Sequence, residues 1–289
     1  MNKPLCKNKY ITIPAVILLV ALLVSGCSFQ VVNGSGNVIS ETRAVSGFTS
    51  VTLAGIGDVY LTQGDIESVR IEAEDNLIPY FETAVQGDTL MIGIKDQYAS
   101  ISLLPTQPVK FYVTLPKVTA ITLAGSGNIF AGTLQTSDFD IALLGSGNIA
   151  AGSLAAANLD IHLNGSGNIT LGTVSADVVT ENVAGSGDIQ VDTLAARTVT
   201  TKTTGSGNIS IGGKVTDQSA VILGSGDYRA GGLKSDTASL RVAGSGNSQV
   251  AVASMLNVTI LGSGDVIYSG SPKVVASIVG SGKVNPASQ

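Results

Sequence analysis

The stretch LLGSGNIAAGSL, from Leu143 to Leu154, is followed 20 residues later by LNGSGNITLGTV, from Leu163 to Val174. The shared phrase is G-S-G, then Asn or Asp, then Ile or Val, and earlier copies start at Gly34 and, as GIGDV, at Gly55. In the later part of the chain its G-S-G triplet recurs every 18 to 20 residues, with the first glycine at Gly125, Gly145, Gly165, Gly185, Gly205, Gly224, Gly244, Gly262 and Gly280. Such a fixed interval is typical of proteins whose repeats stack on one another.

Apolar and variable residues alternate on both sides of each phrase. Ahead of it, ITLA (121–124), IHLN (161–164) and VTIL (258–261) place apolar side chains at their first and third positions. A period of two is typical of β-strands with one face inward, and the recurring glycines indicate turns. The pattern therefore predicts an all-β fold, a single-stranded parallel β-helix (β-solenoid) with about 20 residues per coil.

Two other all-β architectures fit the interval poorly. A propeller blade needs about 40 residues and four longer strands. A sandwich would not keep so regular a spacing. Because crossovers between parallel strands of one sheet are right-handed as a rule, we expect a right-handed coil.

The residue that follows each G-S-G phrase should form a file along the solenoid axis, since residues one period apart are stacked neighbours. The members of this predicted structural ladder are Asn128, Asn148, Asn168, Asp188, Asn208, Asp227, Asn247 and Asp265, with Lys283 at the end. Stacked amides can hydrogen-bond to each other, and separating the Asp residues avoids repulsion between carboxylates. A calcium site is disfavoured, because calcium β-rolls use nonapeptide repeats and calcium prefers several carboxylates per ion. No metal and no cofactor is expected.

Residues 1–26 have the features of a lipoprotein signal peptide. A lysine-containing leader precedes an apolar run from Ile11 to Val24, and the small residues Ser25 and Gly26 stand before Cys27. Basic, apolar and small-residue regions in this order indicate a secretory signal. An uncleaved membrane anchor is the alternative, but the run is shorter than the roughly 20 residues that span a bilayer.

LVSGC, from Leu23 to Cys27, resembles the bacterial lipobox. In that family the signal is cut before the cysteine, whose thiol then carries a lipid. The resemblance makes Cys27 the candidate lipidation site and the membrane a partner through it. It also implies, since Ser28 rather than Asp follows the cysteine, the outer membrane of a Gram-negative cell. Whether the protein faces the periplasm or the cell surface stays open.

Composition further restricts the classes of protein to which the chain can belong. The only other cysteine, Cys6, lies in the leader, so the mature chain is expected to contain no intrachain disulfide. The net charge is −5 and no basic run occurs, which argues against nucleic acid as a partner. With 44% apolar residues in alternation, the chain can bury a core.

The sequence divides the mature chain into four parts. Residues 27–46 are expected to be a lipid-anchored tether that contains a first strand around GSGNVI, from Gly34 to Ile39. Residues 47–117, which contain four prolines, are expected to form an irregular N-terminal cap and the first coils. Residues 118–284 form the regular stack, and 285–289 a frayed tail.

Three groups of side chains are candidates for chemistry. His162, the one histidine, shares a strand face with Asp160, and we interpret both as surface residues because no further partner is evident. The acidic cluster of Glu72, Glu74 and Asp75 could bind a cation, but a solvated edge that discourages end-to-end stacking is favoured. Four tyrosines could form a sugar-stacking platform, although partial core burial is favoured: Tyr60, Tyr80, Tyr98 and Tyr112.

Several segments carry a resemblance to a known family. GFTSVTLAGIGDVYLTQGD (Gly47 to Asp65) and VKFYVTLPKVTAITLAGSGNI (Val109 to Ile129), together with the later phrases, resemble the bacterial family described as "putative auto-transporter adhesin, head GIN domain". The resemblance implies a β-helical exported protein, often lipid-anchored, with no catalytic residues to transfer. We therefore expect a non-enzymatic envelope protein with an adhesin-like or scaffold role, whose partner is a glycan or a cell-surface protein. The alternative is a β-helix protein that binds or cleaves polysaccharide.

Overall fold

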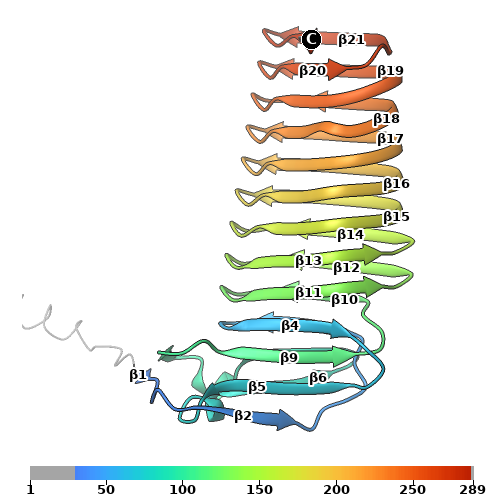
Figure 1. Ribbon diagram of the computed structural model, residues 1–289. Helices are drawn as coiled ribbons and strands as arrows, with labels where there is room; N and C mark the ends of the chain where they lie inside the picture. The colour runs from blue at the N-terminus through green and yellow to red at the C-terminus, as the bar shows by residue number, and fades with distance from the viewer. Residues whose placement is uncertain (1–29, 288–289) are drawn as a thin grey trace, which may run out of the picture.

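The computed structural model describes residues 30–287 and is built almost entirely of strands (Figure 1). We call residues 30–115 the N-terminal section. Its strands are β1 (Gln30–Asn33), β2 (Val38–Arg43), β3 (Ser50–Ala54), β4 (Asp58–Gln63), β5 (Ser68–Glu74), β6 (Phe81–Gln86), β7 (Thr89–Ile94), β8 (Ile101–Leu104) and β9 (Lys110–Leu115). Two 3₁₀ helices, η1 (Ile78–Tyr80) and η2 (Asp96–Tyr98), interrupt them.

Residues 120–286 form the regular stack. Its strands are β10 (Ala120–Leu123), β11 (Asn128–Gln135), β12 (Asp138–Leu143), β13 (Asn148–Ala155), β14 (Asn158–Leu163), β15 (Ile169–Gly185), β16 (Ile189–Gly205), β17 (Ile209–Gly224), β18 (Tyr228–Val242), β19 (Ser248–Gly262), β20 (Val266–Ser269), β21 (Lys273–Gly280) and β22 (Val284–Pro286).

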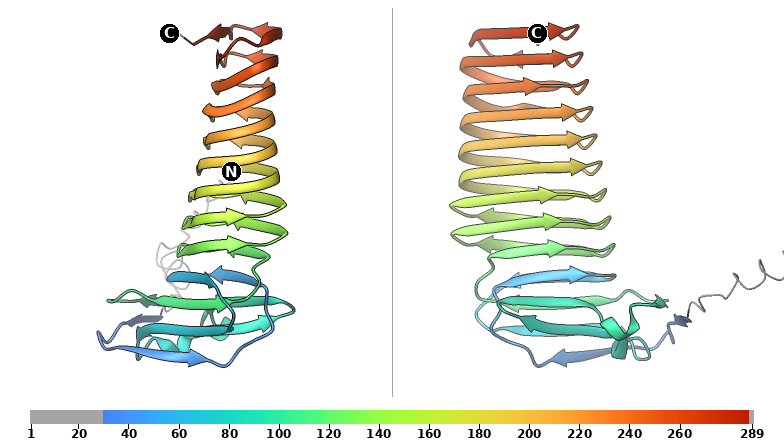
Figure 2. Two further views of the ribbon diagram at one scale, coloured as in Figure 1. Left: turned by 45° about the vertical axis from the view of Figure 1, so that its right-hand side comes forward. Right: turned by 180° about the vertical axis from the view of Figure 1, so that it is seen from behind.

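Every strand pair within the regular stack is parallel, and the register joins residues one period apart. Asn128 lies opposite Asn148, and Ile149 lies opposite Ile169. The two views in Figure 2 show the coils piled one on another along a single axis. The predicted parallel β-solenoid with about 20 residues per coil is confirmed.

The shortened intervals are absorbed by irregularities in register rather than by a break in the stack. Between β18 and β19, Ala230 pairs with Val250, whereas the next pair is Lys234 with Ala251. The residues between Ala230 and Lys234 therefore have no counterpart on the following coil, which is shorter. The G-S-G corners stay aligned above and below this point because the change is confined to the opposite corner.

The core consists of inward files of aliphatic side chains. Ile121, Ile141 and Ile161 are fully buried above one another, as are Leu123, Leu143 and Leu163 on the same strands. A third file is formed by Ile129, Ile149, Ile169, Ile189 and Ile209. Identical side chains repeat at one coil's spacing, so each methyl group packs against its counterparts in the neighbouring coils.

The first coil of the solenoid is formed by β3 and β4, which are far in sequence from the strands they support. β10 and β11 pair with one edge of β3 and β4, while β7 and β9 pair with the other edge. The chain thus makes one coil, builds the rest of the N-terminal section beneath it, and returns to continue the stack (Figure 1).

Antiparallel pairing closes the N-terminal end of the stack. β5 pairs antiparallel with both β2 and β9, and β6 pairs antiparallel with β7. The residues expected to be a tether belong to this arrangement from Gln30 onward, since β1 pairs with β8 and β2 with β5. At the other end, β22 pairs with β20, so the expected tail still contributes to the last coil.

Candidate functional site

The G-S-G corner brings the backbones of successive coils into direct contact. A Cβ atom added to Gly147 would overlap the carbonyl oxygen of Gly127 one coil below, and one added to Gly167 would overlap that of Gly147. These glycines have ordinary negative φ. They are required by the close approach of the backbones, whereas positive φ occurs at other corner glycines such as Gly205.

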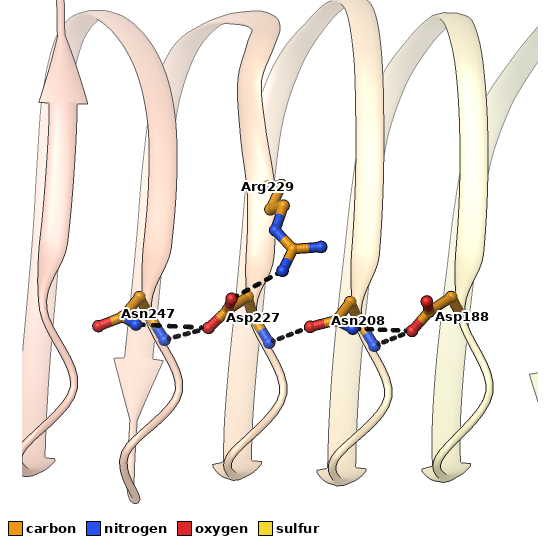
Figure 3. A network of polar contacts seen from close by, with 5 residues as sticks. All are labelled: Asp188, Asn208, Asp227, Arg229 and Asn247. Carbon is orange, nitrogen blue, oxygen red and sulfur yellow. Dashed lines mark hydrogen bonds and ion pairs between the residues drawn. The ribbon is translucent and has the colours of Figure 1, made fainter.

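The residues after these corners lie in one file, part of which is drawn in Figure 3. Each side-chain oxygen accepts a hydrogen bond from the backbone N–H of the next member: Asn168 N to Asn148 Oδ1 (3.1 Å), Asp188 N to Asn168 Oδ1 (3.1 Å), Asn208 N to Asp188 Oδ1 (2.7 Å). The same bond continues through Asp227, Asn247, Asp265 and Lys283. Since Asn and Asp both offer this oxygen, the position accepts either residue.

Where the later member is Asn, its side-chain amide adds a second bond. Asn208 Nδ2 donates to Asp188 Oδ1 at 2.9 Å, and Asn148 Nδ2 donates to Asn128 Oδ1 at 3.1 Å. Asp227 also receives the Arg229 guanidinium at 2.9 Å (Figure 3). Each carboxylate therefore has an amide, a guanidinium or a backbone N–H beside it, and no second carboxylate.

The file begins earlier than the sequence interval suggests. Asn128 Nδ2 donates to Asp58 Oδ1 at 2.8 Å across 70 residues of sequence. Asp58 is the first member of the ladder, which the sequence analysis did not include although it had identified the GIGDV phrase that contains it. The phrase at Gly34 does not join the file: Gly36 N donates to Glu74 Oε1 (2.7 Å) and Asn37 Nδ2 to Asp75 Oδ2 (2.8 Å).

The acidic cluster of the N-terminal section is partly an interior structure, so the solvated-edge interpretation is wrong for Glu74. That carboxylate is fully buried and accepts hydrogen bonds from the Thr106 hydroxyl and from the N–H groups of Gly36, Thr106 and Gln107. The Thr106 hydroxyl, followed by these backbone donors, holds the pKa of Glu74 below its usual value. Through these hydrogen bonds, Glu74 links the loop at Gly36 to the loop at Thr106 and Gln107.

The other two acids serve different contacts. Hydrogen bonds from the Ser35 hydroxyl and the Asn37 amide lower the pKa of Asp75. Glu72 faces the outside, 3.2 Å from the Arg70 guanidinium. Among residues 30–287, no group of three or more His, Cys, Asp and Glu side chains is arranged to hold a metal ion.

The tyrosines form two separate contacts. Tyr60 stacks on Tyr112 with ring centroids 5.3 Å apart, and its other face stacks on Phe130 at 5.4 Å. The Arg70 guanidinium lies 3.9 Å from the centre of the Tyr112 ring. Tyr80 and Tyr98 meet edge to face at 4.8 Å. The sequence alone did not indicate that the four tyrosines divide into two contacts, or that Phe130 and Arg70 belong to one of them.

His162 is exposed on β14, where it lies between Ala142 and Asn182 of the adjacent coils. Asp160 is on the same strand and lies between Asp140 and Thr180. The structure therefore places His162 on an outer face among neutral side chains, two residues from Asp160.

A buried polar cluster, formed by Glu181, Thr201, Gln218, Tyr228 and Ser235, replaces the aliphatic core in the middle of the stack. Thr201 Oγ1 donates to Glu181 Oε2 (2.9 Å), Tyr228 Oη to Gln218 Oε1 (3.1 Å) and Gln218 Nε2 to Ser235 Oγ (2.7 Å). Glu181 follows Ile161 in the inward file, which continues through Thr201 to Ala220, while Tyr228 follows Ile209 in another inward file.

Burial without a positive partner raises the pKa of Glu181 to about 7, although the Thr201 hydroxyl opposes the shift. Its second oxygen, Oε1, has no hydrogen-bond partner among the described residues. Burial, and next the proximity of Glu181, raises the pKa of Tyr228. This cluster was not predicted from the sequence. The signal in the sequence was the alternation itself. The first position of each such segment points inward, and in ENVA (181–184) and TKTT (201–204) that position holds a polar residue.

Cys27 lies outside the described residues, so the structure contains no geometry for the expected lipidation site. Within residues 30–287, no helix has both the length and the apolar character needed to cross a bilayer.

The fold and its surfaces define a class of protein: a β-solenoid whose coils are joined by glycine corners and an Asn/Asp ladder, and whose outer faces carry repeated polar side chains. Residues 47–211 and 172–272 match the family described as "Putative auto-transporter adhesin, head GIN domain". These segments cover most of the chain, which therefore belongs to that family, and the resemblance seen in the sequence is confirmed.

Three similar proteins of solved structure come from two species of the genus Parabacteroides. A "putative lipid binding protein" from Parabacteroides distasonis is 26% identical, with a TM-score of 0.69, 90% of this chain and 100% of that chain being covered. Two putative adhesins share the fold: one from P. distasonis (22% identity, TM-score 0.71, 89% and 100% covered) and one from P. merdae (20%, 0.69, 90% and 100%). None of the proteins with curated descriptions matches the chain.

Proposed function

We propose that the chain is a non-enzymatic, lipid-anchored protein of the cell envelope, in which a rigid rod presents its outer faces for adhesion. Its membership of a family named for adhesins supports this role. The lipobox at Leu23 to Cys27 supports export and anchoring, and Ser28 supports the outer membrane. The lipid-binding description of the relative from P. distasonis suggests contact with lipid as an alternative to glycan.

The observation that carries the proposal is an outer face of in-register neutral side chains. Thr180, Thr200, Ser219, Ser239 and Asn257 follow one another on successive coils, and each is exposed or half-buried. Hydroxyl and amide groups repeated at about 4.8 Å form an ordered file of neutral groups that suits contact with an extended partner.

Cleavage of polysaccharide is less well supported. Hydrolysis of a glycosidic bond uses a pair of carboxyl groups on either side of the scissile bond. The polar groove on this face has Asp217 as the one carboxylate among its lining residues, and that carboxylate accepts a hydrogen bond from the Thr237 hydroxyl. The two buried carboxyl residues, Glu74 and Glu181, face the interior.

Fractionation of cells tests the anchoring. We expect the protein to partition into the detergent phase and to incorporate radiolabelled palmitate, and Cys27→Ala to become soluble and unlabelled. Cys6→Ala, which alters the other cysteine, is the matched control and should behave like the wild type. If Cys27→Ala stays in the detergent phase, the leader is a membrane anchor and the lipoprotein proposal is wrong. Protease treatment of intact cells then distinguishes the surface from the periplasm.

A further inference from the structure

One outer file of the solenoid starts as a continuous stack of flat side chains. In register, it runs through Arg70 on β5, Tyr112 on β9, Tyr60 on β4 and Phe130 on β11. The rings lie 5.3 and 5.4 Å apart and within 25° of parallel. Figure 1 shows these four strands directly one above another. The spacing lies within the range of favourable aromatic stacking.

The two ends of this stack differ. At the N-terminal end the Arg70 guanidinium covers the Tyr112 ring and is itself held by Glu72. At the other end Phe130 has Ala150 as its neighbour on the next coil, and 38% of Phe130 is exposed. A methyl group covers only the base of a phenyl ring, so the outer part of one Phe130 face is open.

The opening above Ala150 has the height of one coil. The next residue in the file is Thr170, two coils from Phe130, which corresponds to about 10 Å along the axis. A ring placed above Ala150 would lie about 5 Å from Phe130, which is a stacking distance. The opening therefore has the dimensions of one absent ring in the stack.

The surroundings of the opening are neutral and polar. Asn148 and Gly152 lie two residues before and after Ala150, on the same face of β13, and both are exposed. Asn148 Nδ2 uses one hydrogen on Asn128, so that its second hydrogen can be donated to a ligand. The Thr170 hydroxyl is exposed on the far side, and Gly152 presents bare backbone.

We propose that the Phe130 face above Ala150 is a stacking site for one ring of a neutral oligosaccharide. A pyranose has an apolar face of C–H groups that packs on an aromatic ring, and hydroxyl groups around its edge. The edge hydroxyls meet the Asn148 amide and the Thr170 hydroxyl. Absence of a charged side chain among Asn148, Ala150, Gly152 and Thr170 favours an uncharged sugar over a phosphate or a uronic acid. This inference rests on the proposed adhesive role and assigns it a ligand class and a place.

Two substitutions test the site in opposite ways. Phe130→Ala removes the stacking face, while Ala150→Phe fills the opening by extending the stack with a fourth ring. Ile267→Ala is the matched control, because Ile267 belongs to the same outer file near the far end of the rod and is 39% exposed. Circular dichroism confirms that each variant is folded, and Ala150→Phe should melt at or above the wild-type temperature.

Binding is measured with the full-length protein in a detergent that has no sugar headgroup. The probes are immobilised hexasaccharides of glucose, mannose, galactose and N-acetylglucosamine. We expect at least one to bind, and both Phe130→Ala and Ala150→Phe to weaken it by about tenfold while Ile267→Ala leaves it unchanged. Equal loss in Ile267→Ala, or unchanged binding in Ala150→Phe, would overturn the site.

The remaining outcomes separate this inference from the proposed function. If the wild type binds none of the hexasaccharides, the sugar site is wrong. The envelope role is then judged by the fractionation of Cys27→Ala alone. If a hexasaccharide binds but neither Phe130→Ala nor Ala150→Phe changes its affinity, glycan binding stands and occurs elsewhere on the rod.

Discussion

The N-terminal section and the regular stack each bury one carboxyl group, and they treat it in opposite ways. Glu74 and Glu181 are both completely buried. Glu74 accepts hydrogen bonds from one hydroxyl and three backbone N–H groups, and its pKa is lowered. Glu181 accepts one bond, from Thr201, and its pKa is raised to about 7.

The difference follows from where backbone donors are available. In the regular stack, the backbone N–H groups of the strands pair with the neighbouring coil, so an inward carboxyl finds only side-chain donors. In the N-terminal section, loops such as the one at Gly36 and the one at Thr106 and Gln107 have N–H groups that no strand uses. Irregular backbone can therefore stabilise a buried charge, whereas a regular coil favours the neutral acid.

The largest difference between the two regions is expected when each buried carboxyl residue is replaced by leucine. Glu74→Leu leaves the N–H groups of Gly36, Thr106 and Gln107 and the Thr106 hydroxyl without their acceptor, so we expect a larger loss of stability than from any other substitution named below, with unfolding of the N-terminal section. Glu181→Leu restores the aliphatic file and should leave the free energy of unfolding at pH 7 unchanged or raise it by about 1 kcal/mol. Urea denaturation followed by circular dichroism measures both. A stable Glu74→Leu, or an unfolded Glu181→Leu, would contradict the explanation from backbone donors.

Glycine provides the second comparison between the regions. Gly147 in the regular stack has ordinary φ but lies against the Gly127 carbonyl, whereas Gly87 in the N-terminal section has φ of 67° and nothing within 4 Å of a Cβ position. Gly147→Ala should cost about 4 kcal/mol, because two backbones would have to separate. Gly87→Ala should cost about 1 kcal/mol, from the left-handed conformation alone. Equal costs in thermal and urea unfolding would show that the stack can relax around a methyl group.

The raised pKa of Glu181 predicts how stability changes with pH. Its ordinary value is 4.5 and its folded value about 7, so between these values the folded state holds a proton that the unfolded state has released. The contribution is fully present below pH 4.5, is lost as the pH rises to about 7, and is then constant, with a total of about 3 kcal/mol. In Glu181→Gln, the free energy of unfolding should lose this dependence on pH between 4.5 and about 7. The reason is that the glutamine retains the Thr201 contact without titrating.

Glu74 should show the reverse dependence. Its lowered pKa contributes stability that is present above the unfolded value and is lost as the pH falls through the folded value. Urea unfolding of Glu74→Gln and Glu181→Gln at a series of pH values from 3 to 8 compares the two carboxyl groups in one protein. If the free energies of unfolding of the two variants changed with pH in the same way, the two regions would not differ in how they stabilise a buried carboxyl group.

The interval between G-S-G phrases was enough to predict the solenoid, because stacking is a consequence of periodicity that needs no knowledge of individual contacts. The same interval could not find Asp58, which lies 70 residues from Asn128. An excursion of the chain between two stacked coils breaks the period without breaking the stack. It likewise could not place β1 and β2, whose partners β8 and β5 are set by loops in the N-terminal section rather than by a repeat.

The buried polar cluster shows a different limit on what one sequence can predict. Alternation predicts that Glu181 and Thr201 point inward, but an average over the repeats treats polar residues there as exceptions. The residues that complete the cluster lie in other coils: Tyr228 takes the place of an isoleucine in its file, and its hydroxyl donates to Gln218, whose amide donates to Ser235. Because the cluster links positions that are 10 or more residues apart and has no fixed spacing, a single sequence does not reveal it.

The smallest expected difference between a variant and its control concerns the ladder, where the second half of the stack alternates Asp and Asn while the first half has consecutive Asn residues. Asn168→Asp keeps the oxygen that accepts from Asp188 N but loses the donor to Asn148 Oδ1, and it places a carboxylate next to Asp188. We expect a loss of about 1 to 2 kcal/mol that becomes smaller in high salt, since part of it is repulsion between exposed charges. Asn164→Asp is the matched control, because Asn164 is exposed in the same coil outside the file. Equal melting temperatures for the two variants would mean that the oxygen alone matters, and that the alternation of Asp and Asn has no part in the stability of the stack.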